Sequence, residues 1–195
     1  MDFKKLQEFV ELVGRLKHLK RTGWVLKGIS EPETVASHMF RMAMFSFLVD
    51  STENLNRTKI MQMALIHDLA ECIVGDITPH CGVSVEEKHK LEDNAMVNIC
   101  QLLGNKGPEL LDLFREYELQ ESPEAKYVKD LDRFDLIAQA YEYERRDKIP
   151  GELEEFFSNT TDKINHPFIQ QMAAEVLQRR QNEILNQKCS ENKDS

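Results

Sequence analysis

An adjacent histidine and aspartate, His67-Asp68, stand in the middle of a segment that is otherwise almost entirely apolar. Glu71 lies four residues after His67 and three after Asp68, so a helix would turn all three side chains toward one region. Apolar residues cover nearly every side of the segment 57–75, which predicts a helix at the centre of a bundle. Because buried charges are costly unless they are paired or bound to metal, these three residues are candidates for chemistry.

The preceding predicted helix carries another histidine among apolar residues. Val35, Met42, Phe45 and Val49 form an apolar stripe, and His38 lies on it, four residues before Met42. Taken singly, a histidine on an apolar face is more often a hydrogen-bonded core residue than a ligand, and a His-Asp pair can be an ordinary hydrogen-bonded couple. Both features on consecutive helices favour a divalent metal ion, because imidazole and carboxylate both bind zinc, manganese and iron.

A metal held between helices would need a further carboxylate from a third helix. The segment 127–137 offers Asp130, Asp132 and Asp135. Periodicity alone does not choose among the three aspartates, so the choice stays open at this point.

Helices must position these residues. The 195 residues include only 8 Gly and 6 Pro, with no convincing alternating strand pattern, which favours long helices. We predict an all-α fold in which residues 1–188 form a single helical bundle domain and residues 189–195 a disordered polar tail. Ser84 with Glu87 and Ser30 with Glu33 have the spacing of capping boxes. The helices are expected at 2–20, 32–51, 57–75, 85–103, 108–119, 123–146 and 165–188.

The composition narrows the class of protein. There are 25 basic and 34 acidic residues, giving a net charge of −9, which disfavours binding to nucleic acid or to anionic membranes. Apolar runs such as Met63-Ala64-Leu65-Ile66 are far shorter than the roughly 18 residues of a membrane span. The N-terminus has no apolar signal region, and the four cysteines show no C-x-x-C spacing. We therefore expect a reduced, intracellular protein located in the cytoplasm.

The order His38, His67-Asp68 and a later aspartate resembles the H…HD…D pattern of the HD-domain metal phosphohydrolases, an all-α superfamily. The stretch from Glu71 to Pro79 reads E-x-x-x-G-D-x-T-P, which is similar to the 5'-deoxynucleotidase branch of that superfamily. The segment Arg21-Thr22-Gly23-Trp24 also resembles this branch, which keeps an Arg and a Trp there. In this sequence Thr22-Gly23 separates the two.

The resemblance implies a set of ligands and a catalytic group. It selects Asp132 among the three aspartates, because Lys129-Asp130-Leu131-Asp132-Arg133 is similar to the family's K-x-x-D-x segment. Glu71 matches the family's catalytic carboxylate. The implied cation is Mn²⁺, Co²⁺ or Mg²⁺, and its implied ligands are His38, His67, Asp68 and Asp132.

The resemblance also implies contacts with a substrate. Asp76 would meet the sugar hydroxyl and select a deoxyribose, and Arg21 would offer a phosphate the planar donor that it needs. In some family members, the residues that match Glu71, Asp76 and the backbone carbonyl of Ile77 hold a second cation instead. The implied substrate-binding residues are Arg21, Trp24, Asp76 and Thr78.

These implications predict a metal-dependent 5'-deoxynucleotidase that hydrolyses dAMP, dGMP, dCMP and dTMP to deoxynucleoside and phosphate and forms a homodimer. Another HD-domain enzyme is the first alternative: a triphosphohydrolase, a cyclic-nucleotide phosphodiesterase or a diiron oxygenase. A catalytically idle helical scaffold is the second. The Gly75-Asp76 loop favours the monophosphate substrate, and the presence of every motif acid and imidazole weighs against the idle scaffold.

Overall fold

The structure is a computed structural model, and it describes residues 2–191. The chain divides into two compact units, residues 1–128 and 129–195. Within the described residues every named element is a helix, and the only β pairing is one antiparallel bridge between Lys20 and Thr34. The predicted all-α fold is therefore confirmed. No helix in the described part of the chain is long and apolar enough to span a membrane.

The first unit contains most of the helices. They are α1 (Phe3–Arg15), α2 (Thr22–Leu26), α3 (Val35–Phe45), η1 (Ser46–Leu48), α4 (Arg57–Ile66), α5 (Glu71–Val74), η2 (Pro79–Cys81), α6 (Val85–Leu102), η3 (Gly104–Lys106) and α7 (Gly107–Leu119). Helix α8 (Pro123–Asp147) begins in this unit and ends in the second, which also contains α9 (Glu154–Ser158), η4 (Thr161–Lys163) and α10 (Pro167–Glu191). Of the predicted tail, residues 189–191 end α10, and 192–195 lie outside the described residues.

Several of the predicted helix boundaries differ from the structure. Helix α1 ends at Arg15 rather than at residue 20, and α3 with η1 covers 35–48 rather than 32–51. The helix expected at 57–75 is divided into α4 and α5 by a turn at residues 67–70. The expected cap at Ser84 is confirmed, since its Oγ accepts a hydrogen bond from the Glu87 N–H at 3.1 Å. The expected cap at Ser30 is wrong, because α3 begins further along the chain and is capped by Thr34.

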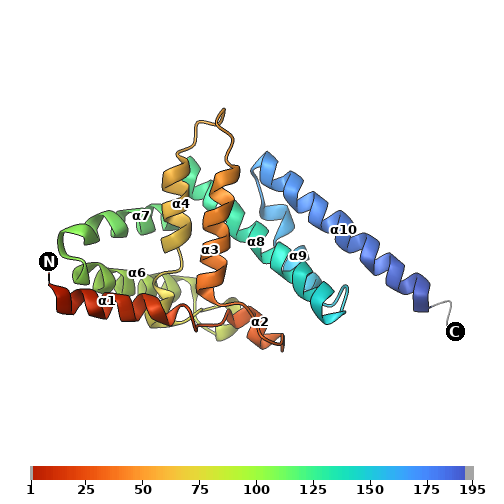
Figure 1. The fold of residues 1–195 in the computed structure, drawn as a ribbon, viewed down its shortest axis with the longest axis horizontal. Helices are drawn as coiled ribbons and strands as arrows, with labels where there is room; N and C mark the ends of the chain where they lie inside the picture. The colour runs from red at the N-terminus through yellow and green to blue at the C-terminus, as the bar shows by residue number, and fades with distance from the viewer. Residues whose placement is uncertain (1, 192–195) are drawn as a thin grey trace. The chain divides into compact units, whose positions relative to one another are not determined.

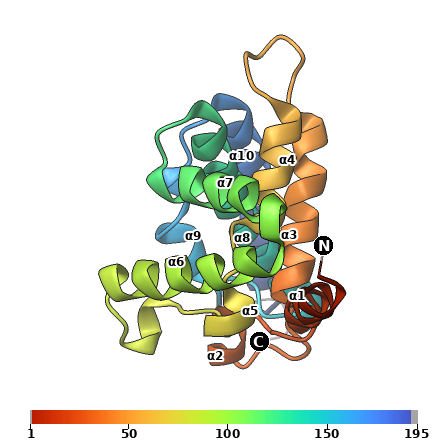
Figure 2. The same cartoon turned by 90° about the vertical axis from the view of Figure 1, so that its left-hand side faces the viewer.

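In the first unit, α3 lies beside α4 and α6 beside α7, while α1 contacts α5 and α6 (Figures 1 and 2). The buried side chains between these helices are mainly aliphatic, with Phe114 on α7 as the largest in the cluster. Gly107 permits the close approach of α7 to α6, because a Cβ at this position would lie 2.1 Å from the carbonyl oxygen of Cys100. This packing supports the turn at residues 67–70 from several sides.

A buried ion pair joins the helices of the second unit. Arg180, on α10, donates to both carboxylate oxygens of Glu144 on α8, at 2.7 and 2.9 Å, and to Glu154 at 2.7 Å. Glu144 is 1% exposed and also accepts the backbone N–H of Leu153 at 2.8 Å. With its charge matched and its hydrogen bonds filled, Glu144 can be buried without an uncompensated charge.

Replacing Arg180 should destabilise the protein far more than replacing its neighbour Arg179. Arg180→Ala leaves the Glu144 carboxylate buried and unpaired, so we expect the free energy of unfolding to fall by about 3–5 kcal/mol. Arg179→Ala removes only an exposed pair with Glu175 and should cost about 0–1 kcal/mol. Urea denaturation followed by circular dichroism measures both values, and equal losses would contradict the role given to the buried pair.

Candidate metal centre

His67 lies at the end of α4, where the helix gives way to the turn. Its side chain is buried, and its Nδ1 lies 3.0 Å from the carbonyl oxygen of Ala64. A carbonyl oxygen can only accept, so Nδ1 carries the hydrogen and Nε2 is the ring atom that can bind a cation. Within the described residues, this buried Nε2 has no hydrogen-bond partner, although Asp68 Oδ2 lies 3.2 Å away.

Asp68 brings together two histidines from different helices. His38, on α3, is completely buried, and its Nε2 lies 3.6 Å from Asp68 Oδ2. The His38 and His67 rings are 5.3 Å apart between centroids. Burial acts to raise the pKa of Asp68, but His67, His38 and Arg21 together hold it well below its usual value. Asp68 is therefore an ionised carboxylate beside two imidazoles.

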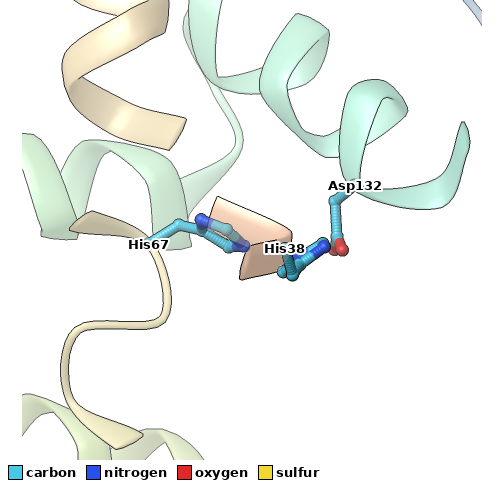
Figure 3. Close-up of side chains that lie close together, drawn as sticks. All are labelled: His38, His67 and Asp132. Carbon is cyan, nitrogen blue, oxygen red and sulfur yellow. The ribbon is translucent and has the colours of Figure 1, made fainter. Parts of the chain in front are cut away.

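Asp132, on α8, carries the expected third-helix carboxylate. One ligand atom each from His38, His67 and Asp132 lie within 4.8 Å of one another, and Figure 3 shows the three side chains close together. One ligand atom each from Glu33, His38 and Asp135 also lie within 4.8 Å of one another, so His38 belongs to both groups. Both groups have the nitrogen and oxygen donors that divalent transition metals bind.

Asp130, the remaining candidate among the three aspartates, has a structural role instead. Its Oδ2 accepts the backbone N–H groups of Asn165 and His166, each at 2.8 Å. Its Oδ1 accepts a hydrogen bond from Arg133 at 2.9 Å. Since these bonds use both oxygens to fix the chain before α10, Asp132 and Asp135 are the aspartates left as possible ligands.

Glu71, at the start of α5, is a buried carboxyl with an unused oxygen. It is 3% exposed, and its Oε2 has no hydrogen-bond partner among the residues that the structure describes. Burial, reinforced by the charges of Asp68 and Asp76, raises the pKa of Glu71 well above its usual value. A carboxyl in this environment keeps its proton at a higher pH than an ordinary glutamate, as a general acid requires.

Arg21 immediately precedes α2 and Trp24 lies within it, and the two side chains share one neighbour, Glu33. Arg21 Nη1 donates to Asp68 Oδ2 at 3.4 Å, and its Nε lies 4.0 Å from Glu33 Oε1. The Trp24 indole N–H donates to the same Glu33 oxygen at 3.0 Å, and Trp24 is 1% exposed. Glu33, which the sequence suggested only as part of a capping box, therefore supports both residues.

Lys88, a cation on α6, was not indicated by any pattern in the sequence. Its Nζ lies 3.6 Å from Glu92 Oε1, an i,i+4 pair that in sequence looks like an ordinary surface pair. Burial opposes the charged form, but Glu92, Asp68, Glu71 and Asp76 together raise the pKa of Lys88. Lys88 thus adds a positive charge near the acidic residues of the turn.

The loop after α5 presents Asp76 and Thr78. Gly75 has φ +80° and ψ 168°, a conformation that L side chains rarely adopt, and it turns the chain out of the helix. Asp76 Oδ2 accepts the backbone N–H of Thr22 at 2.6 Å. The Thr78 hydroxyl lies 3.4 Å from Cys81 Sγ, just before η2, and both residues are accessible from solvent.

The fold and the histidine–aspartate cluster are those of a recognised class of proteins. A family model described as the HD domain matches residues 13–176, and the chain belongs to this family. Two relatives carry the name 5'-deoxynucleotidase HDDC2. The one from Danio rerio is 49% identical over 161 residues, covering 82% of this chain and 80% of that protein. The one from Homo sapiens is 44% identical over 182 residues, covering 93% and 89%.

A solved structure agrees with this assignment. The crystal structure of the PH0347 protein from Pyrococcus horikoshii OT3 matches with a TM-score of 0.72 and 31% identity. The match covers 90% of this chain and 98% of that one. The likeness therefore extends over nearly the whole length of both chains.

Glu92 should make the stability of the metal-free protein depend on pH. Burial, with smaller contributions from Glu118 and Asp68, raises its pKa to about 7, against 4.5 for an unperturbed glutamate. Between these values the folded state binds more protons than the unfolded state, so this contribution to stability is lost as the pH rises toward 7. Glu92→Gln should flatten the fall in melting temperature between pH 5 and pH 8 and raise its value at pH 8 by about 2–4 °C.

Thermal melts of the two proteins at several pH values measure this effect. Glu86→Gln, which changes an exposed residue in the first turn of the same helix, serves as the control and should leave the pH profile parallel to wild type. An unchanged pH profile for Glu92→Gln would contradict the assignment.

Proposed function

We propose that this chain is a metal-dependent 5'-deoxynucleotidase, which releases phosphate from deoxyribonucleoside 5'-monophosphates. The observation that carries the proposal is the buried, unbonded Nε2 of His67, held beside His38 and Asp68. An imidazole nitrogen in this position fits a metal ligand better than a core histidine, whose polar atoms are normally hydrogen-bonded. The names of the HDDC2 relatives support the reaction and the substrate class.

The proposed ligands of the cation are His38, His67, Asp68 and Asp132. Two imidazoles with carboxylates suit Mn²⁺ or Co²⁺ better than Mg²⁺, which prefers oxygen ligands. A bound ion of this kind lowers the pKa of coordinated water and neutralises charge on a phosphoryl group.

The remaining residues supply charge and a proton. Arg21 and Lys88 are the cations that we assign to the substrate phosphate, since phosphoryl transfer depends mainly on positioning and on charge neutralisation. Glu71, protonated because of its burial, gives its proton to the leaving 5'-oxygen. Asp76 accepts a hydrogen bond from the sugar hydroxyl, and the Thr78 hydroxyl can form a hydrogen bond to the same substrate. Trp24 contributes by anchoring Glu33 beside Arg21.

A second cation held by Glu71, Asp76 and the carbonyl of Ile77 is the competing assignment. It would require Glu71 to be ionised, and a cation bound there would itself favour the ionised form. Without a second cation, burial and the neighbouring carboxylates raise the pKa of Glu71, and our proposal assigns Glu71 as the proton donor.

We also propose that two copies of the chain associate as a homodimer. Phe40, Met44, Phe47 and Leu48 are large apolar residues on α3 and η1, and each is between 46% and 64% exposed. Exposed apolar groups that gather in this way are typical of protein contact surfaces. We assign this surface to the second copy of the chain.

A cytoplasmic location is consistent with the cysteines. Cys72, Cys81 and Cys100 are free thiols, and burial raises the pKa of Cys72 to about 11, which keeps it unreactive. We infer a reducing compartment, in which such thiols persist.

Phosphate release from dAMP, dGMP, dCMP and dTMP should require Mn²⁺, Co²⁺ or Mg²⁺ and should stop when EDTA is added. Glu71→Gln preserves the shape of the side chain but removes the proton donor, so kcat should fall by about 10²–10⁴-fold. A colorimetric phosphate assay measures both effects, with the ribonucleotides run in parallel.

Asp68→Ala should lose both activity and bound metal, measured by elemental analysis. A folded protein that releases no phosphate with any of the metals would favour another HD-domain reaction or the idle scaffold.

The homodimer should have a mass of about twice 22.7 kDa in light scattering coupled to size-exclusion chromatography. Phe40→Glu places a charge in the proposed contact surface and should shift the protein to a monomer. Phe3→Glu alters an equally apolar residue that is 81% exposed on α1 and should leave the dimer intact. A monomeric wild type, or a dimer that survives Phe40→Glu, would contradict the assigned surface.

A further inference from the structure

Thr22 makes two hydrogen bonds to Asp76, a residue 54 positions further along the chain. Its backbone N–H donates to Asp76 Oδ2 at 2.6 Å, and its hydroxyl donates to the Asp76 carbonyl oxygen at 2.8 Å. Thr22 is the first residue of α2, so its N–H is one of the donors that a helix start leaves without a partner inside the helix. Asp76 satisfies this donor from another segment.

The two bonds fix different parts of Asp76. The bond from the Thr22 N–H holds Asp76 Oδ2, so Oδ1 is the carboxylate oxygen that can accept a hydrogen bond from another group. The second holds the peptide carbonyl that precedes Ile77, and so the orientation of the backbone at Asp76. Because Gly75 before it adopts a positive φ that other residues resist, Asp76 lies between a glycine turn and the Thr22 contact.

The segment that carries Thr22 is itself anchored at both ends. Arg21 donates to Asp68, and the Trp24 indole N–H donates to Glu33. These contacts hold Thr22 in place relative to the histidine–aspartate cluster. The two hydrogen bonds from Thr22 therefore restrain the position of Asp76 relative to the same cluster.

We propose that Thr22 is a positioning residue that determines the sugar selectivity of the enzyme by holding Asp76 at two points. Its N–H holds the carboxylate, and its hydroxyl holds the backbone carbonyl, so loss of the hydroxyl frees the backbone that sets the direction of the carboxylate. A held carboxylate accepts a hydrogen bond from a sugar hydroxyl through its other oxygen but cannot move aside for an additional 2'-hydroxyl. An additional hydroxyl that meets no free acceptor in such a fixed site loses its hydrogen bonds to water without replacing them, so the site discriminates against it. This inference rests on the proposed deoxynucleotidase activity and on the role given there to Asp76.

The test compares Thr22→Val, which removes the hydroxyl at nearly constant shape, with Thr22→Ser, which keeps it. Both variants keep the backbone N–H bond to Asp76, so the start of α2 retains its cap. The ratio of kcat/KM for dAMP to that for AMP should fall about tenfold in Thr22→Val, the effect expected for one lost hydrogen bond. Thr22→Ser should keep this ratio within about twofold of wild type. We expect the change to lie mainly in a lower KM for the ribonucleotide.

A binding measurement tests the same contact without turnover. Isothermal titration with 2'-deoxyadenosine and adenosine should show that the wild-type preference for the deoxynucleoside is lost in Thr22→Val and kept in Thr22→Ser. Circular dichroism confirms folding, and Thr22→Ala replaces the valine variant if valine disturbs α2.

The outcomes separate this inference from the proposed function. A wild type that releases no phosphate from any deoxynucleotide overturns the proposed function, and the nucleoside titrations still decide the role of Thr22. An active wild type without sugar preference, or a valine variant that keeps the preference, overturns the role of Thr22. Equal loss of selectivity in the serine and valine variants also overturns it, because the hydroxyl would then be irrelevant.

Discussion

The carboxylate of Asp68 is the point on which the polar interior of the first unit depends. One of its oxygens lies near His38 Nε2 and His67 Nε2 and accepts a hydrogen bond from Arg21. Burial acts to raise the pKa of this carboxyl, and the combined effect of its three neighbours lowers it. Those neighbours come from α3, from the end of α4 and from the residue before α2. The charge can persist only while these segments keep their places, so the packing of the helices and the ionisation of Asp68 support each other.

Asp68 and Glu71 lie close together in sequence at the turn of residues 67–70, but their pKa values are shifted in opposite directions. The pKa of Asp68 is lowered and that of Glu71 is raised. Asp68 faces imidazoles and a guanidinium, whereas Glu71 is buried with the charges of Asp68 and Asp76 near it. Burial acts to raise the pKa of both groups, and the difference lies in the sign of the neighbouring charges. A pair of carboxyl groups separated in this way can supply an anion and a proton donor at one pH, which is the division of roles that hydrolysis of a phosphate ester needs.

The sequence predicted the helical fold and the cluster around His38, His67 and Asp68, because ionisable residues on apolar faces are conspicuous. It could not predict that the helix ends at His67, since the apolar pattern continues through 57–75 without a glycine or proline until Gly75. Helices as short as α2 and α5 contain too few residues to show a period. The Thr22–Asp76 contact joins residues far apart in the chain, and the Lys88–Glu92 spacing is the same whether it lies on a surface or near an acidic cluster. The short helices, the Thr22–Asp76 contact and the surroundings of Lys88 all depend on residues that are distant in the sequence. A local sequence pattern carries no information about such residues.

Helix α2 depends on hydrogen bonds to acidic residues from other parts of the chain. Five residues are too few for a helix to persist on its own, so tertiary bonds must hold it. Those bonds run from Arg21 to Asp68, from Thr22 to Asp76 and from Trp24 to Glu33. The acceptor in each of these three bonds is an acidic side chain, and Asp68 among them lies beside His38 and His67 in the candidate centre. Helix α2 and the candidate centre therefore depend on some of the same acidic side chains.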